Sequence, residues 1–495
     1  MGAYQELEGR FEELAALGHA FGILGWDEQT QMPEGSAPAR NEAVSRLRVL
    51  AHRLITSDAL GELLKQAADE QLDDWQRANL ALMQRERDHA LVLPAEFVQR
   101  QSQASMEAEQ AWRKLRPAND WIGFLPYFET NLALVREEAN LRARDLGVSP
   151  YDALLDLYEP GLTSADLDNW FGALDATLPD LIDGAAARSR GQSPLLPKGP
   201  FSIRAQEQLG RTVMGLLQFD FDRGRLDVAV HPFCGGAIGD VRITTRYRED
   251  DFQESLMGII HETGHAQYQQ NLPERWRLQP VGSATGMAVH ESQSLFFEMQ
   301  IGRSPEFMRT LGPLLAEAFP NEASEVWGQE NLVPLYQRVR PGLIRVSADE
   351  VTYPAHILLR YEIEKELLSG DLKPADLPAR WHQGMQARLG LGTEGNDKDG
   401  CMQDVHWPSG AFGYFPTYTV GAMIAAQLAA RLREDLPDWS GQWQRGELGP
   451  TRDWLHERIW TQGSRRPMKA LVEAATGQPL SADAYLTHLR RRYLD

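Results

Sequence analysis

The segment from Asp250 to Tyr268 constrains this chain more than any other. Its apolar residues recur at three- and four-residue spacing, a period that predicts an α-helix with one buried face. His261 and His265 are four residues apart, so both imidazoles project from the same side of that helix. Glu262 lies about 100° further round, within reach of a water molecule beside the two histidines. The pattern His-Glu-x-x-His is therefore typical of two zinc ligands and a general base.

Gly264 lies inside this motif, although glycine costs a helix about 1 kcal/mol relative to alanine. We therefore expect another part of the molecule to approach the helix backbone closely at that residue.

A third metal ligand is needed, because a catalytic zinc takes three protein ligands and leaves one position open for water. The preferred candidate is Glu291, in His290-Glu291-Ser292-Gln293 on the next predicted helix, 282–301. Glu298 lies on the same face of that helix and is the alternative.

Composition excludes several classes of function. The 495 residues are 42% hydrophobic and carry a net charge of −20, which disfavours nucleic acids and anionic membranes as partners. No apolar run approaches the roughly 18 residues of a membrane span, and no signal peptide is expected. Two cysteines, Cys234 and Cys401, form no disulfide framework, and we expect a cytoplasmic protein.

Helical periodicity over most of the chain predicts a mainly α protein. The first helix is expected to end near Gly25, before a polar loop at 26–36, and Pro354 should kink a helix at 347–368. Residues 226–230 and 241–247 alternate and are β-branched, so they predict two strands, with Cys234-Gly235-Gly236 in their connection. An edge strand at this place could pair with an extended peptide.

Three further segments place polar groups in apolar or glycine-rich surroundings, at 231–244, 344–350 and 400–418. Singly, each has a structural interpretation. Arg345 could pair with a carboxylate at a helix end, His406 and Trp407 could form a buried packing pair, and Tyr414 could belong to the core.

Together, these motifs resemble the signature set of the thermostable metallocarboxypeptidase family of the carboxypeptidase Taq type. In chain order they are His-Pro-Phe at 231, Asp-x-Arg-x-Thr at 240, His-Glu-x-x-His at 261, His-Glu-Ser-Gln at 290, Ile-Arg-x-x-Ala-Asp at 344 and Gly-x-x-Gln-Asp-x-His-Trp at 400. The resemblance covers essentially the whole chain. It implies a single domain over 1–495 with a helical, two-lobed fold, one small sheet and a deep substrate groove. An N-terminal helical region would reach about residue 190, and a catalytic region would begin at about 200.

The resemblance also implies a function. The family removes single residues from peptide C-termini with broad specificity, proline being disfavoured, and its members are homodimers. By motif match, His261, His265 and Glu291 become the ligands of one Zn²⁺ per subunit, with Co²⁺ as the alternative metal. Glu262 becomes the catalytic carboxylate.

The remaining roles follow from chemistry. A developing oxyanion needs a neutral or cationic donor, and His406 and Tyr414 are the candidates, with Tyr418 one turn further along as the alternative.

An exopeptidase must also hold the free α-carboxylate of its substrate, which arginine does best. Arg345, Arg242 and Arg246 are the candidates, in that order. We group Gln403, Asp404 and His231 with the substrate-binding residues, although the chemistry gives no specific role to Asp404 or to the segment of His231.

Two rival functions remain. The chain could be an oligopeptidase or dipeptidyl carboxypeptidase of related fold, which would cut internal bonds or release dipeptides. It could also be a peptide-binding protein with a structural zinc. Glu262 argues against the second, because such a protein has no need of a general base.

Overall fold

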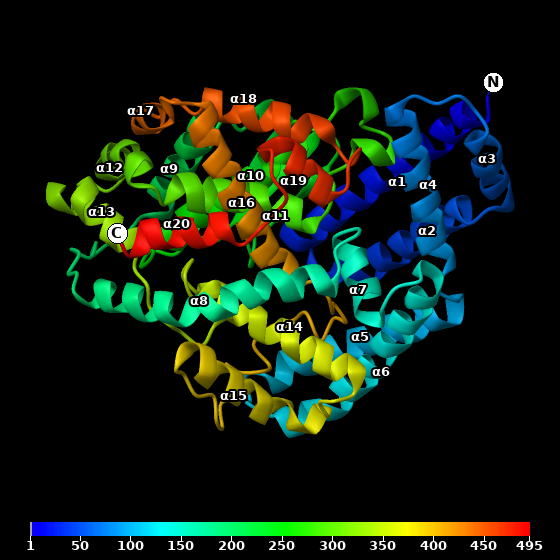
Figure 1. Ribbon diagram of the computed structural model, residues 1–495, viewed down its shortest axis with the longest axis horizontal. Helices are drawn as coiled ribbons and strands as arrows, with labels where there is room; N and C mark the ends of the chain where they lie inside the picture. The colour runs from blue at the N-terminus through cyan, green and yellow to red at the C-terminus, as the bar shows by residue number, and fades with distance from the viewer. Residues whose placement is uncertain (1) are drawn as a thin grey trace. The chain divides into compact units, whose positions relative to one another are not determined.

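The computed structural model describes residues 2–495, of which 69% are helical (Figure 1). It also contains one three-stranded sheet. The prediction of a mainly α fold with a small sheet is confirmed. The chain forms two compact units. The first comprises the segment ending at Leu91, Pro194–Leu335 and Gln427–Pro479; the second comprises Val92–Ser193, Tyr336–Ala426 and Leu480–Asp495. The predicted extent of one domain over 1–495, divided near residues 190–200, stays a prediction.

Both units are built mainly of α-helices. Those of the first unit are α1 (Ala3–Thr30), α2 (Ala37–Ile55), α3 (Asp58–Ala68), α4 (Asp74–Leu91), α9 (Ile203–Leu216), α10 (Gln253–Gln270), α11 (Met287–Leu295), α12 (Pro305–Ala318), α13 (Gln329–Tyr336, which ends at the unit boundary), α17 (Trp439–Gln444), α18 (Gly449–Arg458) and α19 (Met468–Thr476). Those of the second are α5 (Ala95–Leu115), α6 (Trp121–Leu146), α7 (Pro150–Tyr158), α8 (Ser164–Arg190), α14 (Tyr353–Ser369), α15 (Leu377–Leu389) and α20 (Asp483–Tyr493). Helix α16 (Pro416–Asp435) passes from the second unit into the first.

Two local predictions are wrong. Helix α1 continues through the expected loop to Thr30, because Trp26 is buried and the Thr30 hydroxyl donates to the Trp26 carbonyl at 2.8 Å. Pro354 lies in the first turn of α14, where a backbone N–H has no helical acceptor. Proline is tolerated there, so no kink is required.

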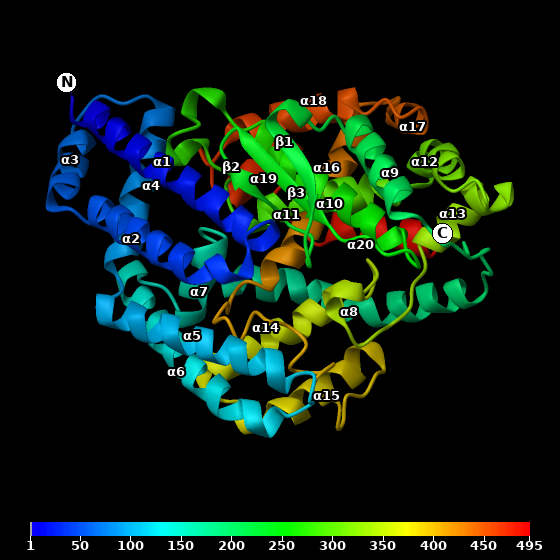
Figure 2. The same ribbon diagram turned by 180° about the vertical axis from the view of Figure 1, so that it is seen from behind.

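The sheet precedes α10 and has three strands, one more than predicted. Strands β1 (Gly224–Val228), β2 (Cys234–Ala237) and β3 (Asp240–Thr245) lie in the order β1-β3-β2 (Figure 2). β1 is parallel to β3, and β2 is antiparallel to it. The Cys-Gly-Gly run expected in a connection is therefore part of an edge strand. α1 lies beside this strand, with Gly22 against the carbonyl of Gly236.

Helix α10 begins where the Asp251 carboxylate accepts hydrogen bonds from the backbone N–H groups of Gln253, at 2.8 Å, and Glu254, at 3.2 Å. Ile259 and Ala266 on its apolar face are buried against the sheet and α9. This packing removes apolar area from water and fixes the helix that carries the His-Glu-x-x-His motif.

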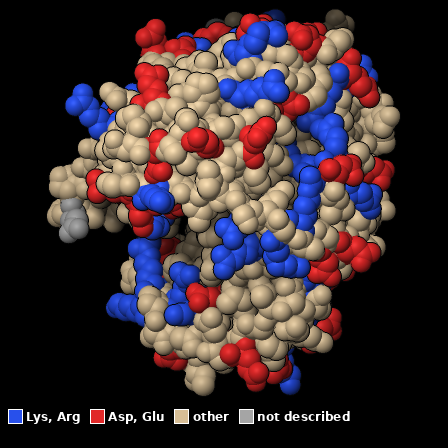
Figure 3. Space-filling model, turned by 90° about the vertical axis from the view of Figure 1, so that its left-hand side faces the viewer, with Lys and Arg blue, Asp and Glu red and all other residues tan. Residues whose placement is uncertain are grey.

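The surface carries charges of both signs. Figure 3 shows acidic and basic side chains interspersed over one face, so the net charge of −20 does not gather there into a single acidic field. Within residues 2–495, no helix combines the length and apolar character that crossing a membrane requires.

Gly264 is the point of close approach that the sequence predicts. A Cβ atom at this residue would lie 2.5 Å from the carbonyl oxygen of Gln293 and 2.6 Å from the Cα of Ser294, both in α11. The absence of a side chain therefore allows α10 and α11 to touch through their backbones.

Replacing Gly264 with alanine should destabilise the protein by about 1–3 kcal/mol, because one of two packed backbones must move. Urea unfolding followed by circular dichroism measures the change. Gly258→Ala on the same helix is the control, since its Cβ would meet only Pro232, at 3.9 Å. The control should be neutral or slightly stabilising. Equal stability of the two variants would contradict the close-contact interpretation.

Candidate active site

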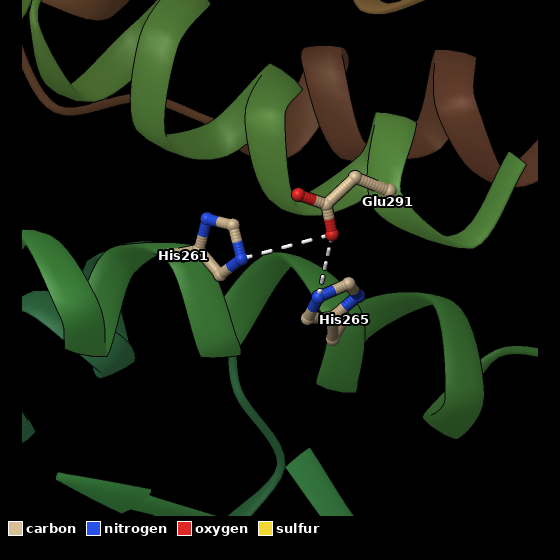
Figure 4. A group of neighbouring side chains, drawn as sticks. All are labelled: His261, His265 and Glu291. Carbon is tan, nitrogen blue, oxygen red and sulfur yellow. Dashed lines mark ion pairs between the residues drawn. The ribbon is translucent and has the colours of Figure 1, made fainter. Parts of the chain in front are cut away.

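Three predicted metal ligands converge in the first unit. His261 and His265 project from α10 toward Glu291 on α11 (Figure 4). One Glu291 carboxylate oxygen lies 3.3 Å from His265 Nε2 and 3.9 Å from His261 Nε2, and the three ligand atoms lie within 4.8 Å of one another. Tetrahedral bonds of about 2.0–2.1 Å would place neighbouring ligand atoms about 3.3 Å apart. The three ligand atoms thus have nearly the spacing that ligands adopt around a small divalent ion.

Each histidine has a second partner that orients its ring. Nδ1 of His261 lies 2.9 Å from a carboxylate oxygen of Glu298, and Nδ1 of His265 lies 3.1 Å from the carbonyl oxygen of His290. Both partners are acceptors, so each Nδ1 carries the proton. Each Nε2 faces Glu291 and, once deprotonated, would present its lone pair to a metal ion beside that carboxylate, which is the arrangement that metal-binding histidines need.

Glu298, the alternative ligand, lies behind His261 instead. It belongs to a π-helical turn, η5 (Phe296–Gly302), that continues α11, where the sequence predicts one regular helix. Its second carboxylate oxygen accepts from Arg303 Nη2 at 2.7 Å. Burial alone would raise the pKa of Glu298, but the charges of Arg303 and His261 hold it at about 2. Glu298 is therefore an anionic partner for the imidazole.

Negative charge is concentrated around the two imidazoles. Burial lowers the pKa of His261, but Glu291, Glu298 and Glu262 outweigh it and raise the value to about 10. Burial also raises the pKa of Glu262, which is the direction that a general base requires. Three carboxylates around two imidazoles attract positive charge, and a divalent cation that binds there would replace the proton of His261. These donor types suit zinc.

The predicted carboxylate-binding arginine lies in the second unit, in a buried charge cluster. Arg345 donates through Nε, at 3.0 Å, and Nη2, at 2.8 Å, to one oxygen of Asp404. Arg360 donates through Nε, at 2.7 Å, and Nη2, at 2.5 Å, to the other. Burial raises the pKa of Asp404, but the two guanidinium groups hold it well below its usual range. One carboxylate thus faces two guanidinium groups, which leaves a net positive charge.

The predicted oxyanion donors lie close to this cluster. His406 Nε2 lies 3.1 Å from the hydroxyl of Tyr418, whose ring packs against the Tyr414 ring and the guanidinium group of Arg345. Burial and the charge of Arg345 lower the pKa of His406 to about 4, so the imidazole is neutral near pH 7. Neutral imidazole and phenol groups can both donate a hydrogen bond.

Gln403 holds the backbone of this region rather than presenting a free amide. Its oxygen accepts from the Arg345 backbone N–H at 2.8 Å, and its Nε2 donates to the carbonyl groups of Leu343, at 3.0 Å, and Asp399, at 2.8 Å. Gln403 therefore fixes the start of the segment that carries Arg345.

The other predicted substrate-binding residues lie in or near the sheet of the first unit. Arg242 pairs through two nitrogens with Asp240 and lies over the Trp26 ring. Arg246 pairs with Glu254 on the surface. The side chain of His231 is exposed. Both arginines therefore already have carboxylate partners.

Sequence reasoning missed three charged groups near these sites, Arg303, Arg360 and Glu364. Arg360 completes the Asp404 cluster, and Glu364 accepts hydrogen bonds from Tyr151, Trp407 and the backbone of Gly413. Arg360 and Glu364 lie four residues apart on α14, and both are fully buried. The four-residue spacing that places both on one helix face was the signal in the sequence that could have indicated them. Charged residues on a buried face almost always have a partner.

Comparison with known proteins agrees with this geometry. The sequence profile of the carboxypeptidase Taq (M32) metallopeptidase family matches residues 6–493. The chain belongs to that family. It is 37% identical to thermostable carboxypeptidase 1 of Thermus thermophilus over 504 residues, 99% of this chain and 98% of the relative. It is 35% identical to carboxypeptidase 1 of Bacillus subtilis, over 98% and 97%.

Solved structures of M32 enzymes show the same fold. Trypanosoma cruzi metallocarboxypeptidase 1 superposes with a TM-score of 0.97 at 45% identity, covering 100% of this chain and 99% of that one. The M32 carboxypeptidase of Deinococcus radiodurans gives 0.94 at 34% identity, covering 99% and 98%. This M32 chain is thus a carboxypeptidase-class metallopeptidase, which acts on peptides and needs a divalent metal ion.

The geometry predicts different losses of metal affinity at the two candidate glutamates. Glu298→Gln removes the anionic partner of His261 and should weaken metal binding about 10–100-fold. Glu291→Ala removes a coordinating oxygen and should weaken it further. Metal retention against a graded series of chelators measures both, with the surface variant Glu317→Gln as control. Full retention by Glu291→Ala, with loss in Glu298→Gln, would exchange the two roles.

Proposed function

We propose that this enzyme is a zinc-dependent carboxypeptidase that releases single C-terminal residues with broad specificity, proline being disfavoured. The supporting observation is the convergence of His261 Nε2, His265 Nε2 and Glu291 beside the buried carboxylate of Glu262. One Zn²⁺ per subunit is the proposed metal, and Co²⁺ is the alternative. Assembly as a homodimer and a cytoplasmic location stay predictions, as does a deep substrate groove.

The reaction assigns a proton-transfer role to Glu262. A divalent ion at the site supplies Lewis acidity, which polarises a carbonyl group and acidifies a water molecule. Glu262 accepts the proton of the attacking water and then delivers it to the amine that leaves as the peptide bond breaks. Burial raises the pKa of Glu262, so its carboxylate takes up a proton more readily than an exposed glutamate does.

Arg345 is the proposed partner of the substrate α-carboxylate. It is 5% exposed, and its bonds to Asp404 and to the Tyr353 hydroxyl, at 2.6 Å, leave one N–H on each Nη nitrogen. The net positive charge shared with Arg360 favours an anionic ligand. Asp404 and Gln403 act by holding Arg345 in place. Arg242 and Arg246 are weaker candidates because their surface carboxylate partners already balance their charges.

Stabilisation of the oxyanion is assigned to His406 together with Tyr414 or Tyr418. The neutral imidazole and the phenol groups donate hydrogen bonds without adding a full charge, which suits an oxyanion that forms only during the reaction. No catalytic or binding role follows for His231, which lies just before β2.

The two rival functions predict different products. An oligopeptidase or dipeptidyl carboxypeptidase of related fold would leave internal fragments or dipeptides. A peptide-binding protein with a structural zinc would leave the peptide intact, and its helices would unfold when the metal is removed.

Incubation of a peptide of known sequence should give successive losses of single C-terminal residues by mass spectrometry. A chelator should stop these losses while circular dichroism retains the helical signal. Glu262→Gln should retain zinc but lose about 10²–10⁴-fold in kcat, the usual worth of general-base catalysis. Glu254→Gln, at the exposed start of the same helix, serves as the control. Internal cuts, or an active Glu262→Gln enzyme, would overturn the proposal.

The arginine assignment can be tested with paired substrates. Wild-type enzyme should cleave a free-acid peptide far faster than its C-terminal amide, because the amide removes the charge that Arg345 pairs with. Arg345→Lys should lower kcat/KM for the free acid about 10–100-fold, since lysine cannot reproduce the planar fork. Arg242→Lys should have little effect. The opposite ranking of the two variants would move the role to Arg242.

A further inference from the structure

A cavity of about 400 Å³ lies within the first unit and has no part in the reaction proposed above. Its walls come from α1, α4, β2 with its turn to β3, the last turn of α10 at Gln269, and residues 277–280, 283 and 290. The volume falls within the range of about 300–1,000 Å³ that ligand cavities occupy. Chemistry-bearing residues that line it are His19, Glu86, Cys234, Gln269, Arg277 and His290.

Part of the cavity wall contacts the proposed metal-binding residues. His290 stacks on the ring of His265 with ring centres 4.5 Å apart, and Gln269 Nε2 lies 2.8 Å from His290 Nε2. Burial raises the pKa of the Cys234 thiol, and the charge of nearby Glu262 raises it further. A peptide placed at the metal centre would therefore have this cavity beside it.

The part of the wall that α4 forms carries a carboxylate, that of Glu86, without a counter-ion among the described residues. Among the described residues, no hydrogen bond or ion pair of Glu86 is found, and burial alone raises the pKa of its carboxyl to about 7. The side chain remains accessible through the cavity. Arg277 does not neutralise it, since it pairs with Glu274 at 2.8 Å.

We propose that this cavity binds a cationic group of the peptide substrate on the amino-terminal side of the bond that is cut, with the Glu86 carboxylate as its partner. The cation is a lysine or arginine side chain or, in a short peptide, the free α-amino group. The α-carboxylate of the substrate is excluded from this cavity, because the Glu86 carboxylate repels it. The proposal rests on the proposed function, and it adds a substrate preference that the metal ligands do not determine.

Binding without turnover tests the proposal. Calorimetry on Glu262→Gln would compare acetylated alanine-rich pentapeptides that carry one lysine, moved from position to position, with the same peptides carrying norleucine. At one position the lysine peptide should bind about tenfold more tightly, the usual worth of a charge-assisted hydrogen bond. Adding Glu86→Gln should abolish this difference. Adding Glu12→Gln, an exposed α1 carboxylate that does not line the cavity, should preserve it.

A second comparison, between acetylated and free peptides without lysine, identifies the source of the cation. Tighter binding of the free peptide that vanishes in Glu86→Gln assigns the site to the α-amino group. The absence of any preference for lysine or a free amine, or a preference that survives Glu86→Gln, overturns the proposal. Neither result depends on product release, so a failure of the proposed carboxypeptidase reaction would appear separately in the mass-spectrometric assay.

Discussion

The candidate metal centre depends on the backbone contact between α10 and α11. Because Gly264 has no side chain, Gln293 and Ser294 lie against the turn of α10 that separates the two histidines of the motif. The close packing of the two helices brings a Glu291 carboxylate oxygen to 3.3 Å from His265 Nε2 and places the His290 carbonyl against His265 Nδ1. One pair of packed helices thus positions both the proposed metal ligand Glu291 and the His290 carbonyl that orients His265.

Charge is distributed differently in the two units. In the first, Glu262, Glu291 and Glu298 surround two imidazoles, which raises the affinity for a divalent cation. In the second, Arg345 and Arg360 share the single carboxylate of Asp404, which favours an anion. Burying these groups is unfavourable unless each is paired, so the hydrogen bonds that complete both clusters also specify their geometry.

The sequence predicted the features that depend on regular spacing. The histidine pair, the helix that carries it and the candidate Glu291 all follow from helical periodicity and known ligand types. Strand β2 escaped prediction because Cys-Gly-Gly has neither alternation nor β-branched residues, and its place is determined by pairing with β3. The partners Arg360 and Glu364 could not be assigned, because residues distant in the chain determine which buried charges meet.

The π-helical turn η5 has a consequence for insertions and deletions. Each residue advances an α-helix by about 100°, and a π turn accommodates one residue more than a regular turn. Loss of one residue between Glu291 and Glu298 would convert the turn to regular α-helix and preserve Glu291 on its own turn. Glu298 would move round the axis by less than the 100° of one α-helical residue, because the π turn accommodates the residue that is lost. The π turn therefore lets the chain carry one extra residue after Glu291 while Glu298 still contacts His261.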